Sequence, residues 1–178
     1  DGELTSKLQH VEIGSEVVVM PKCTGTLVNS ALVPGGELWM LATGTGLAPF
    51  MSLIRDLETL ETWTKIHIVH STRLFSDLAY NTDLASAFKL HPQDGELHEM
   101  VDAVLEYHPI LTGQGQARIT EQLATGQLPI NVGQDKIMVC GNLEFNHQVA
   151  DWCRAQGMTE GSLREPGTFV IERAFVEK

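Results

Sequence analysis

The chain has 178 residues, of which 43% are apolar and 20% are charged, and its formal net charge is −11. This apolar content supports a folded core and argues against a disordered chain. The acidic excess argues against a general nucleic-acid binder, because a protein that neutralises phosphates presents a basic face. No apolar run reaches the roughly 18 residues of a membrane span, so neither a nucleic acid nor a membrane is an expected partner.

The first 35 residues differ in composition from the rest, since they carry few large apolar groups and several turn residues. A short helix is predicted over residues 5–11, and a strand over residues 16–20, where β-branched residues cluster. A stretch of this size is too small to bury a core of its own. The chain begins with Asp1 rather than Met, so we expect it to be an N-terminally truncated part of a longer protein.

From residue 36 onward, apolar runs alternate with segments of helical period. In chain order we predict strand 37–43, helix 47–60, strand 65–71, helix 78–90, a polar turn at 91–99, strand 103–111, helix 118–124, strand 136–141, helix 143–155 and strand 168–175. Alternation at these lengths indicates an α/β domain over residues 36–178. We expect an open, mostly parallel sheet with helices on both faces.

The strongest local motif is ATGTGLAPF, residues 42–50, which follows the first buried strand and opens the first helix. Gly44 and Gly46 allow a sharp turn and close approach to a ligand, and free amides at a helix start favour a pyrophosphate. In an open parallel sheet such loops lie at the carboxyl edge, where ligands bind. Pro49 occupies the third glycine position of the dinucleotide fingerprint, and two glycines alone are equally compatible with an ordinary tight turn.

Arginines follow at positions suited to a phosphate. Arg73 ends the second predicted strand, where NAD-binding proteins place an acidic residue for the ribose 2′-hydroxyl. A guanidinium there suits a 2′-phosphate by charge and by paired hydrogen bonds. Arg118 opens a later helix and is placed to reach the same phosphate, although either arginine alone is more often a solvated surface charge.

Cysteine, histidine and acidic residues give weaker signals. Cys140 ends the fourth predicted strand in MVCGN, where it either faces the crevice or is a buried small apolar group. Glu172, in the closing strand, reads by itself as a solvated carboxylate. The three cysteines contain no CxxC pair, which favours a reducing, cytoplasmic compartment. The seven histidines show no metal-ligand spacing, so no metal site is expected.

Together these segments resemble one family. GELTSKLQH, LWMLATGTGLAPFMSLI, VHSTR, IMVCGN and the ending VIERAFVEK are similar to the bacterial ferredoxin (flavodoxin)–NADP reductases, over nearly the whole chain. The resemblance implies an oxidoreductase that transfers a hydride between NADP(H) and FAD and single electrons to or from ferredoxin or flavodoxin. It also implies that residues 1–35 are the C-terminal remnant of an antiparallel β-barrel that binds FAD, and that residues 36–178 bind NADP(H).

The resemblance also implies roles by position. Residues 4–6 match the segment that holds the FAD pyrophosphate, residues 44–49 match the loop that receives NADP, and Cys140 and Glu172 match the catalytic residues near the nicotinamide. The implied cofactor-binding residues are Leu4, Thr5, Ser6, Thr43, Gly44, Thr45, Gly46, Leu47, Ala48, Pro49, Arg73, Arg118, Gly141, Asn142, Ala174 and Phe175.

Two departures from the family pattern keep alternatives open. Gly113 stands where relatives usually carry an arginine, which removes one charge-assisted contact to NADPH, about 1.5–3 kcal/mol. The family's Arg-x-Tyr-Ser flavin segment should lie before Asp1. The alternatives are an NADH-dependent reductase component of an oxygenase, and a nucleotide-binding module without activity of its own. In either case we expect a cytoplasmic monomer.

Overall fold

A computed structural model describes residues 5–19, 21, 25–84 and 103–172. Its centre is a five-stranded sheet in which every paired strand runs parallel to its neighbour. The strands are β1 Leu38–Thr43, β2 Ile66–Thr72, β3 Leu105–Leu111, β4 Lys136–Cys140 and β5 Phe169–Ile171. Their order, β3-β2-β1-β4-β5, confirms the predicted parallel α/β sheet and places the reversal of strand order beside β1.

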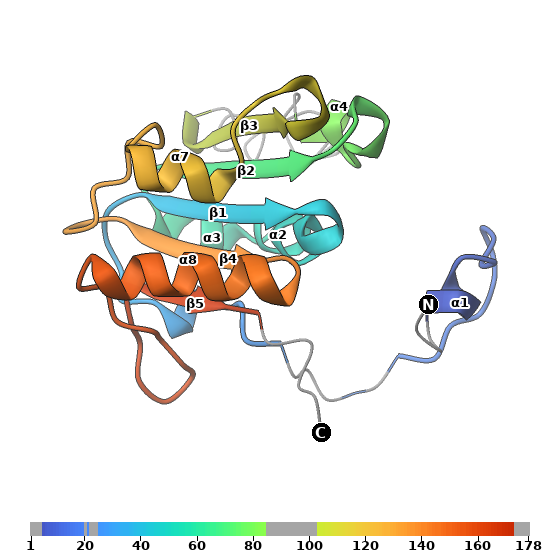
Figure 1. Ribbon diagram of the computed structural model, residues 1–178. Coiled ribbons are helices and arrows are strands. Elements are labelled where there is room, and N and C mark those ends of the chain that lie inside the picture. Colours follow the sequence, from blue (N-terminus) through green and yellow to red (C-terminus); the bar gives the residue numbers. More distant parts are fainter. Residues whose placement is uncertain (1–4, 20, 22–24, 85–102, 173–178) are drawn as a thin grey trace.

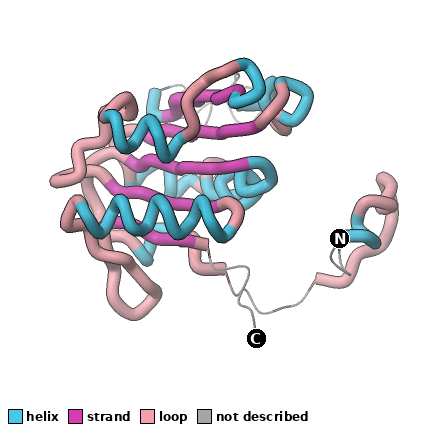
Figure 2. Tube along the Cα trace, in the orientation of Figure 1, coloured by secondary structure: helices cyan, strands magenta, loops and turns pink. Residues whose placement is uncertain are grey.

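Helices cover both faces of this sheet, as predicted (Figures 1 and 2). The α-helices are α1 Thr5–Leu8, α2 Ala48–Leu53, α3 Leu57–Thr62, α4 Asn81–Leu84, α7 Ile119–Thr125 and α8 Leu143–Ala155. Single 3₁₀ turns are η1 Asn29–Ala31, η2 Gly44–Leu47, η3 Phe75–Asp77 and η4 Thr112–Gln114. Within the described ranges, no helix is both long and apolar enough to cross a bilayer.

Successive side chains of each strand point to opposite faces of the sheet, so the core consists of two layers, one on each face. Met40 of β1 packs on one face with Phe50 of α2 and other residues of α2 and α3. Leu41, its neighbour, packs on the opposite face with Ile119 of α7 and Val149 of α8. Since both faces of β1 are buried, the run LWMLAT is apolar almost throughout, which is why this strand is readable from the sequence.

The predicted helix over residues 47–60 is wrong in one respect, because two short helices occupy this stretch. The chain leaves helical geometry after α2, and Asp56 begins α3 by accepting a hydrogen bond from the Glu58 amide. An aspartate at this position satisfies an amide that a helix start leaves free. The apolar period continues across the break, so periodicity alone could not reveal it.

The predicted strand over residues 16–20 is also wrong where the structure describes it. Residues 16–19 have irregular backbone, and the Val18 side chain is 94% exposed. β-branched residues favour a pleated surface only when a neighbouring strand supplies hydrogen bonds and packing. Figure 1 shows α1 and the residues after it apart from the sheet, so this segment has no ladder partner among the described strands.

The α/β core extends to residues before position 36. Leu27, Ala31 and Leu32 are buried in the same layer as α2 and α3. The Gly167 amide donates to the Ala31 carbonyl at 3.0 Å, and the Val33 amide donates to the Gly167 carbonyl at 2.8 Å. The barrel remnant at residues 1–35 stays a prediction. The turn at 91–99 and residues 85–90 of the helix predicted over 78–90 lie outside the described residues, and α4 occupies only part of the remainder.

Candidate functional site

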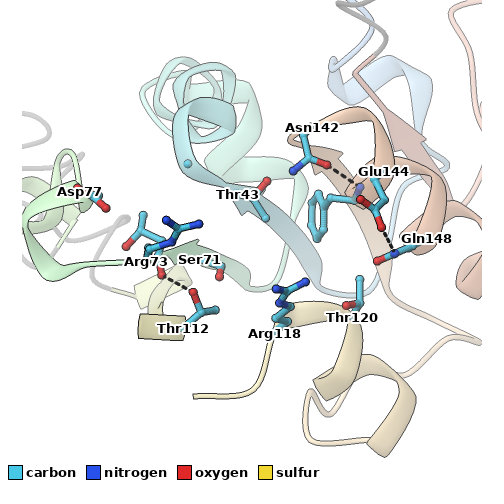
Figure 3. Close-up of a pocket in the computed structure, with 13 residues that line it drawn as sticks. Thr43, Ser71, Arg73, Asp77, Thr112, Arg118, Thr120, Asn142, Glu144 and Gln148 are labelled. Carbon is cyan, nitrogen blue, oxygen red and sulfur yellow. Dashed lines mark hydrogen bonds between the residues drawn. The ribbon is translucent and has the colours of Figure 1, made fainter. Parts of the chain in front are cut away.

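The carboxyl ends of β1, β2 and β4 converge on a cavity of about 390 Å³. Its lining consists of strand-end, loop and helix-start residues (Figure 3): Thr43, Gly44, Ser71, Thr72, Arg73, Asp77, Thr112, Arg118, Thr120, Asn142, Glu144, Phe145 and Gln148. The cavity lies where the strand order reverses, between elements that follow β1 and β4. Open α/β sheets bind their ligands in the crevice at this point.

Backbone packing holds the glycine loop after β1 against β4. Gly46 is buried, and a Cβ atom there would lie 2.1 Å from the Cys140 carbonyl oxygen. A Cβ atom on Gly141 would lie 2.3 Å from Thr43 Oγ1. Gly44 differs, because it has a φ of +53° and open space around its Cβ position. Only Gly44 of these three therefore leaves room for a ligand, whereas the other two bring strand ends together.

A buried histidine fixes the other side of this loop. His70 is fully buried; its Nε2 lies 2.9 Å from the Gly44 carbonyl oxygen and its Nδ1 lies 3.3 Å from the Tyr107 hydroxyl. Burial lowers the pKa of His70 and raises that of Tyr107 to about 12. A neutral imidazole that donates from Nε2 to Gly44 and accepts at Nδ1 from Tyr107 satisfies all three groups. No motif in the sequence indicates this positioning role.

Arg73 and Arg118 stand at the rim of the cavity on different elements (Figure 3). Both also line an adjoining cavity of about 470 Å³. Arg118 is the N-cap residue of α7, and its amide donates to Glu121 at 3.0 Å. Neither guanidinium has an ion-pair partner in the described part of the chain. Two cations beside two polar cavities give this end of the site the positive charge that an anion would need.

Gly113 shapes the same end through its backbone. Its amide donates to the Arg73 carbonyl at 2.9 Å, and a Cβ atom on Gly113 would lie 2.4 Å from that oxygen. The Thr112 hydroxyl donates to the Thr72 carbonyl at 3.2 Å beside it. A side chain of any size at position 113 would therefore displace Arg73, so glycine here holds the arginine in place.

Cys140 and Glu172 are brought together at the ends of β4 and β5. Burial first, and then the charge of Glu172, raise the pKa of Cys140 to about 11. The Glu172 carboxylate accepts from the Thr26 amide at 3.3 Å and from the Thr26 hydroxyl at 3.2 Å. Asn146 of α8 donates to the Glu172 carbonyl at 3.1 Å. The thiol is therefore protonated near neutral pH, which excludes a standing thiolate nucleophile.

The remaining predicted positions divide into several groups. Asn142 lines the cavity and begins α8 by accepting from the Phe145 amide at 2.9 Å. Thr45 is exposed in η2, whereas Leu47 is buried in the core. The cavity lining does not include Thr45, Gly46, Leu47, Ala48, Pro49 or Gly141. Leu4, Ala174 and Phe175 lie outside the described residues.

Several lining residues were not expected from the sequence. Ser71 and Thr72 are polar residues at a strand end, a position that could have indicated them. Glu144 and Gln148 are four residues apart on α8 and hydrogen bond at 3.1 Å, so they share a helix face. Thr112 and Thr120 depend on the path of the chain after β3, for which the sequence offered no motif.

The described residues fit a nucleotide phosphate better than a flavin. The open backbone at Gly44 and the two arginines provide space and positive charge for a phosphorylated ligand. Thr5 and Ser6, expected at the FAD pyrophosphate, belong to α1, which lies apart from the carboxyl edge of the sheet (Figure 1). The described residues therefore do not assemble a flavin pocket.

Comparison with known proteins agrees with this geometry. Residues 40–151 match the oxidoreductase NAD-binding domain family. The chain is 42% identical to a flavodoxin/ferredoxin–NADP reductase of Rhodobacter capsulatus, covering 99% of this chain and 68% of the relative. It is 40% identical to a ferredoxin–NADP reductase of Azotobacter vinelandii, covering 100% of this chain and 72% of the relative.

A solved structure has the same fold. It is a ferredoxin NADP⁺ reductase of Neisseria gonorrhoeae with bound FAD and NADP, similar with a TM-score of 0.80 at 22% identity. The match covers 98% of this chain and 71% of that protein.

Proposed function

Because the chain belongs to the ferredoxin–NADP reductase family, we propose that it binds NADP(H) in an enzyme that transfers a hydride between NADP(H) and FAD. The same enzyme would pass single electrons to or from ferredoxin or flavodoxin. The observation that supports this most directly is the cavity where three strand ends meet beside Arg73 and Arg118. In such enzymes the nicotinamide and the flavin supply the redox chemistry, and the protein supplies binding and orientation.

We assign the 2′-phosphate of NADP(H) to the arginine end of the cavity. Arg73 and Arg118 line both adjoining hollows, so a phosphate between them would meet two cations. Each charge-assisted hydrogen bond contributes about 1.5–3 kcal/mol. Gly113 supports this assignment, since it holds the Arg73 backbone in place.

The nicotinamide would lie toward Cys140 and Glu172. The protonated Cys140 thiol is a small polarizable group that keeps its hydrogen on Sγ, so it orients the ring without forming a covalent bond to it. Thr26 and Asn146 hold Glu172, which keeps a carboxylate at this end. For FAD, the proposed contacts are Leu4, Thr5, Ser6, Thr43, Ala174 and Phe175, and family membership rather than the described geometry supports them.

A binding experiment tests the phosphate assignment without a flavin. Isothermal titration of the protein with 2′,5′-ADP and with 5′-AMP compares ligands that differ in the 2′-phosphate. We expect Arg73→Gln and Arg118→Gln each to weaken 2′,5′-ADP about 10- to 100-fold and to leave 5′-AMP within twofold. Arg164→Gln, at an exposed arginine outside both hollows, is the matched control. Equal losses for both ligands would refute the assignment.

The second candidate is an NADH-dependent reductase component of an oxygenase, since position 113 carries no side chain that could contact a 2′-phosphate. Tight binding of 5′-AMP together with no gain from the 2′-phosphate would favour this candidate.

We further propose a cytoplasmic monomer, with ferredoxin or flavodoxin as its partner. The free thiols Cys140 and Cys153 support a reducing compartment. Light scattering during size-exclusion chromatography gives the molar mass in solution and so tests whether the protein is a monomer.

A further inference from the structure

A cluster of histidine and carboxylate groups lies on the sheet near the amino ends of β2 and β3. His67 is in register with Glu106, and His108 follows two residues later on the same face of β3. His67 Nδ1, His108 Nε2 and a Glu106 carboxylate oxygen all lie within 4.8 Å of one another. The histidines are 41 residues apart in sequence, so the cluster exists only because the two strands pair in this register.

We propose that His67, His108 and Glu106 form a binding site for a divalent transition metal of the zinc class. The three ligand atoms are separated by 3.1 Å between the two nitrogens, by 3.4 Å from His67 to Glu106 and by 3.7 Å from His108 to Glu106. Tetrahedral zinc with bonds of about 2.0–2.2 Å to nitrogen and oxygen separates its ligands by about 3.4 Å. The cluster therefore has the spacing of three zinc ligands, and solvent would complete the fourth position.

Neighbouring groups hold His67 and Glu106 in orientation, as the groups around metal ligands commonly do. His67 Nε2 lies 2.8 Å from the Glu37 carboxylate; because a carboxylate only accepts, Nε2 carries hydrogen and the neutral ring keeps its lone pair at Nδ1. Lys65 pairs with the other oxygen of Glu106, which leaves Oε2 facing the histidines. The Trp39 ring stacks on His67 with centroids 4.0 Å apart and restrains the imidazole.

The charge balance also favours a cation. Glu37 and Glu106 against Lys65 leave one net negative charge around the two rings. Without metal, one hydrogen lies between His67 Nδ1 and His108 Nε2. On metal binding His108 would change tautomer and carry that hydrogen on Nδ1, so that both facing nitrogens coordinate the ion.

The site is separate from the proposed nucleotide cavity. Ser71, which lines that cavity, is four residues beyond His67 on β2, or about 13 Å at the rise of a parallel strand. β3 is an edge strand of the sheet and its residues are mostly half-buried. A metal ion held by both strands would therefore fasten this edge to β2, and we expect a stabilising role rather than a part in hydride transfer.

The test uses purified protein that has been stripped with chelator and dialysed. Titration calorimetry with Zn²⁺ should give one site per chain, and Co²⁺ should develop the intense visible bands of tetrahedral coordination. At a hundredfold excess of Zn²⁺ over its Kd, the melting temperature should rise by about 5–10 °C. Absence of the Co²⁺ bands or of the thermal shift would overturn the proposal.

Variants locate the site. His108→Gln and Glu106→Gln change half-exposed edge-strand residues, so the fold should tolerate them, as circular dichroism verifies, and each should weaken Zn²⁺ at least tenfold. Glu37→Gln should weaken it 10- to 100-fold through His67. His147→Gln, at an exposed histidine of α8, is the matched control and should bind as the wild type does. Retained affinity in both His108→Gln and Glu106→Gln, or its loss in His147→Gln, would assign the metal to adventitious surface binding.

Discussion

Replacing Gly46 with alanine tests whether the glycine loop is shaped by packing or by a ligand. The added Cβ atom would lie 2.1 Å from the Cys140 carbonyl oxygen and 2.6 Å from its carbonyl carbon. Both are backbone atoms at the end of β4, so no side-chain rotation relieves the clash. We expect a loss of about 3 kcal/mol, at the upper end of the range for overpacked cores. A chain of this length should then melt about 6–12 °C lower.

Gly44→Ala is the matched control within the same loop. Its Cβ atom would meet nothing within 4 Å, but the backbone φ of +53° is left-handed, so the cost should be about 1–2 kcal/mol. Urea denaturation followed by circular dichroism gives both values from the transition midpoints. If Gly46→Ala unfolds at the wild-type midpoint, or if Gly44→Ala is the more damaging change, the packing explanation is wrong.

Two further predictions concern titratable groups near the cavity. Since Cys140 has its pKa raised from 9.0 to about 11, the folded state keeps the thiol proton where the unfolded chain loses it. The stability that the protonated thiol contributes to the folded state is fully present below pH 9 and is lost as pH rises toward about 11. In Cys140→Ser, the urea midpoint should therefore decline less steeply over this pH range. An unchanged decline would contradict the raised pKa of Cys140. His70→Phe leaves the Gly44 carbonyl without its donor, at a cost of about 1–3 kcal/mol. It should also weaken 2′,5′-ADP, whereas Tyr107→Phe, which keeps the bond to Gly44, should bind nearly normally by calorimetry.

The sheet and its carboxyl edge were predictable because their signals are local. β1 and β2 are buried throughout except for the half-buried Thr43. Their sequences, LWMLAT and IHIVHST, are therefore rich in apolar or β-branched residues, and the end of each strand marks the site. Arg73 directly follows β2, Asn142 comes two residues after the end of β4, and both line the cavity. The sequence therefore predicts the position of a strand-end residue once the strand itself is recognised.

Features that depend on pairing across the chain were not predictable. The sequence alone indicates only that glycine replaces an arginine at position 113. The contact of Gly113 with the Arg73 carbonyl exists only after β3 has paired with β2. The same register brings His67 to His108, and no spacing in the sequence indicates it. The irregular backbone at residues 16–19 shows the reverse case, in which strand-forming residues lack a described partner.

The two proposed sites predict a specific lack of coupling. Coupling between ligands is reciprocal, so Zn²⁺ changes nucleotide affinity only if a shared element differs between the bound states. β2 carries His67 near one end and Ser71 near the other, but all of its residues are buried between β1 and β3, and such a strand has little freedom to shift. Zn²⁺ at saturation should therefore raise the melting temperature while 2′,5′-ADP keeps its Kd within twofold. A tenfold change in that Kd, lost again in His108→Gln, would show that β2 moves as a unit and that the metal regulates the nucleotide site.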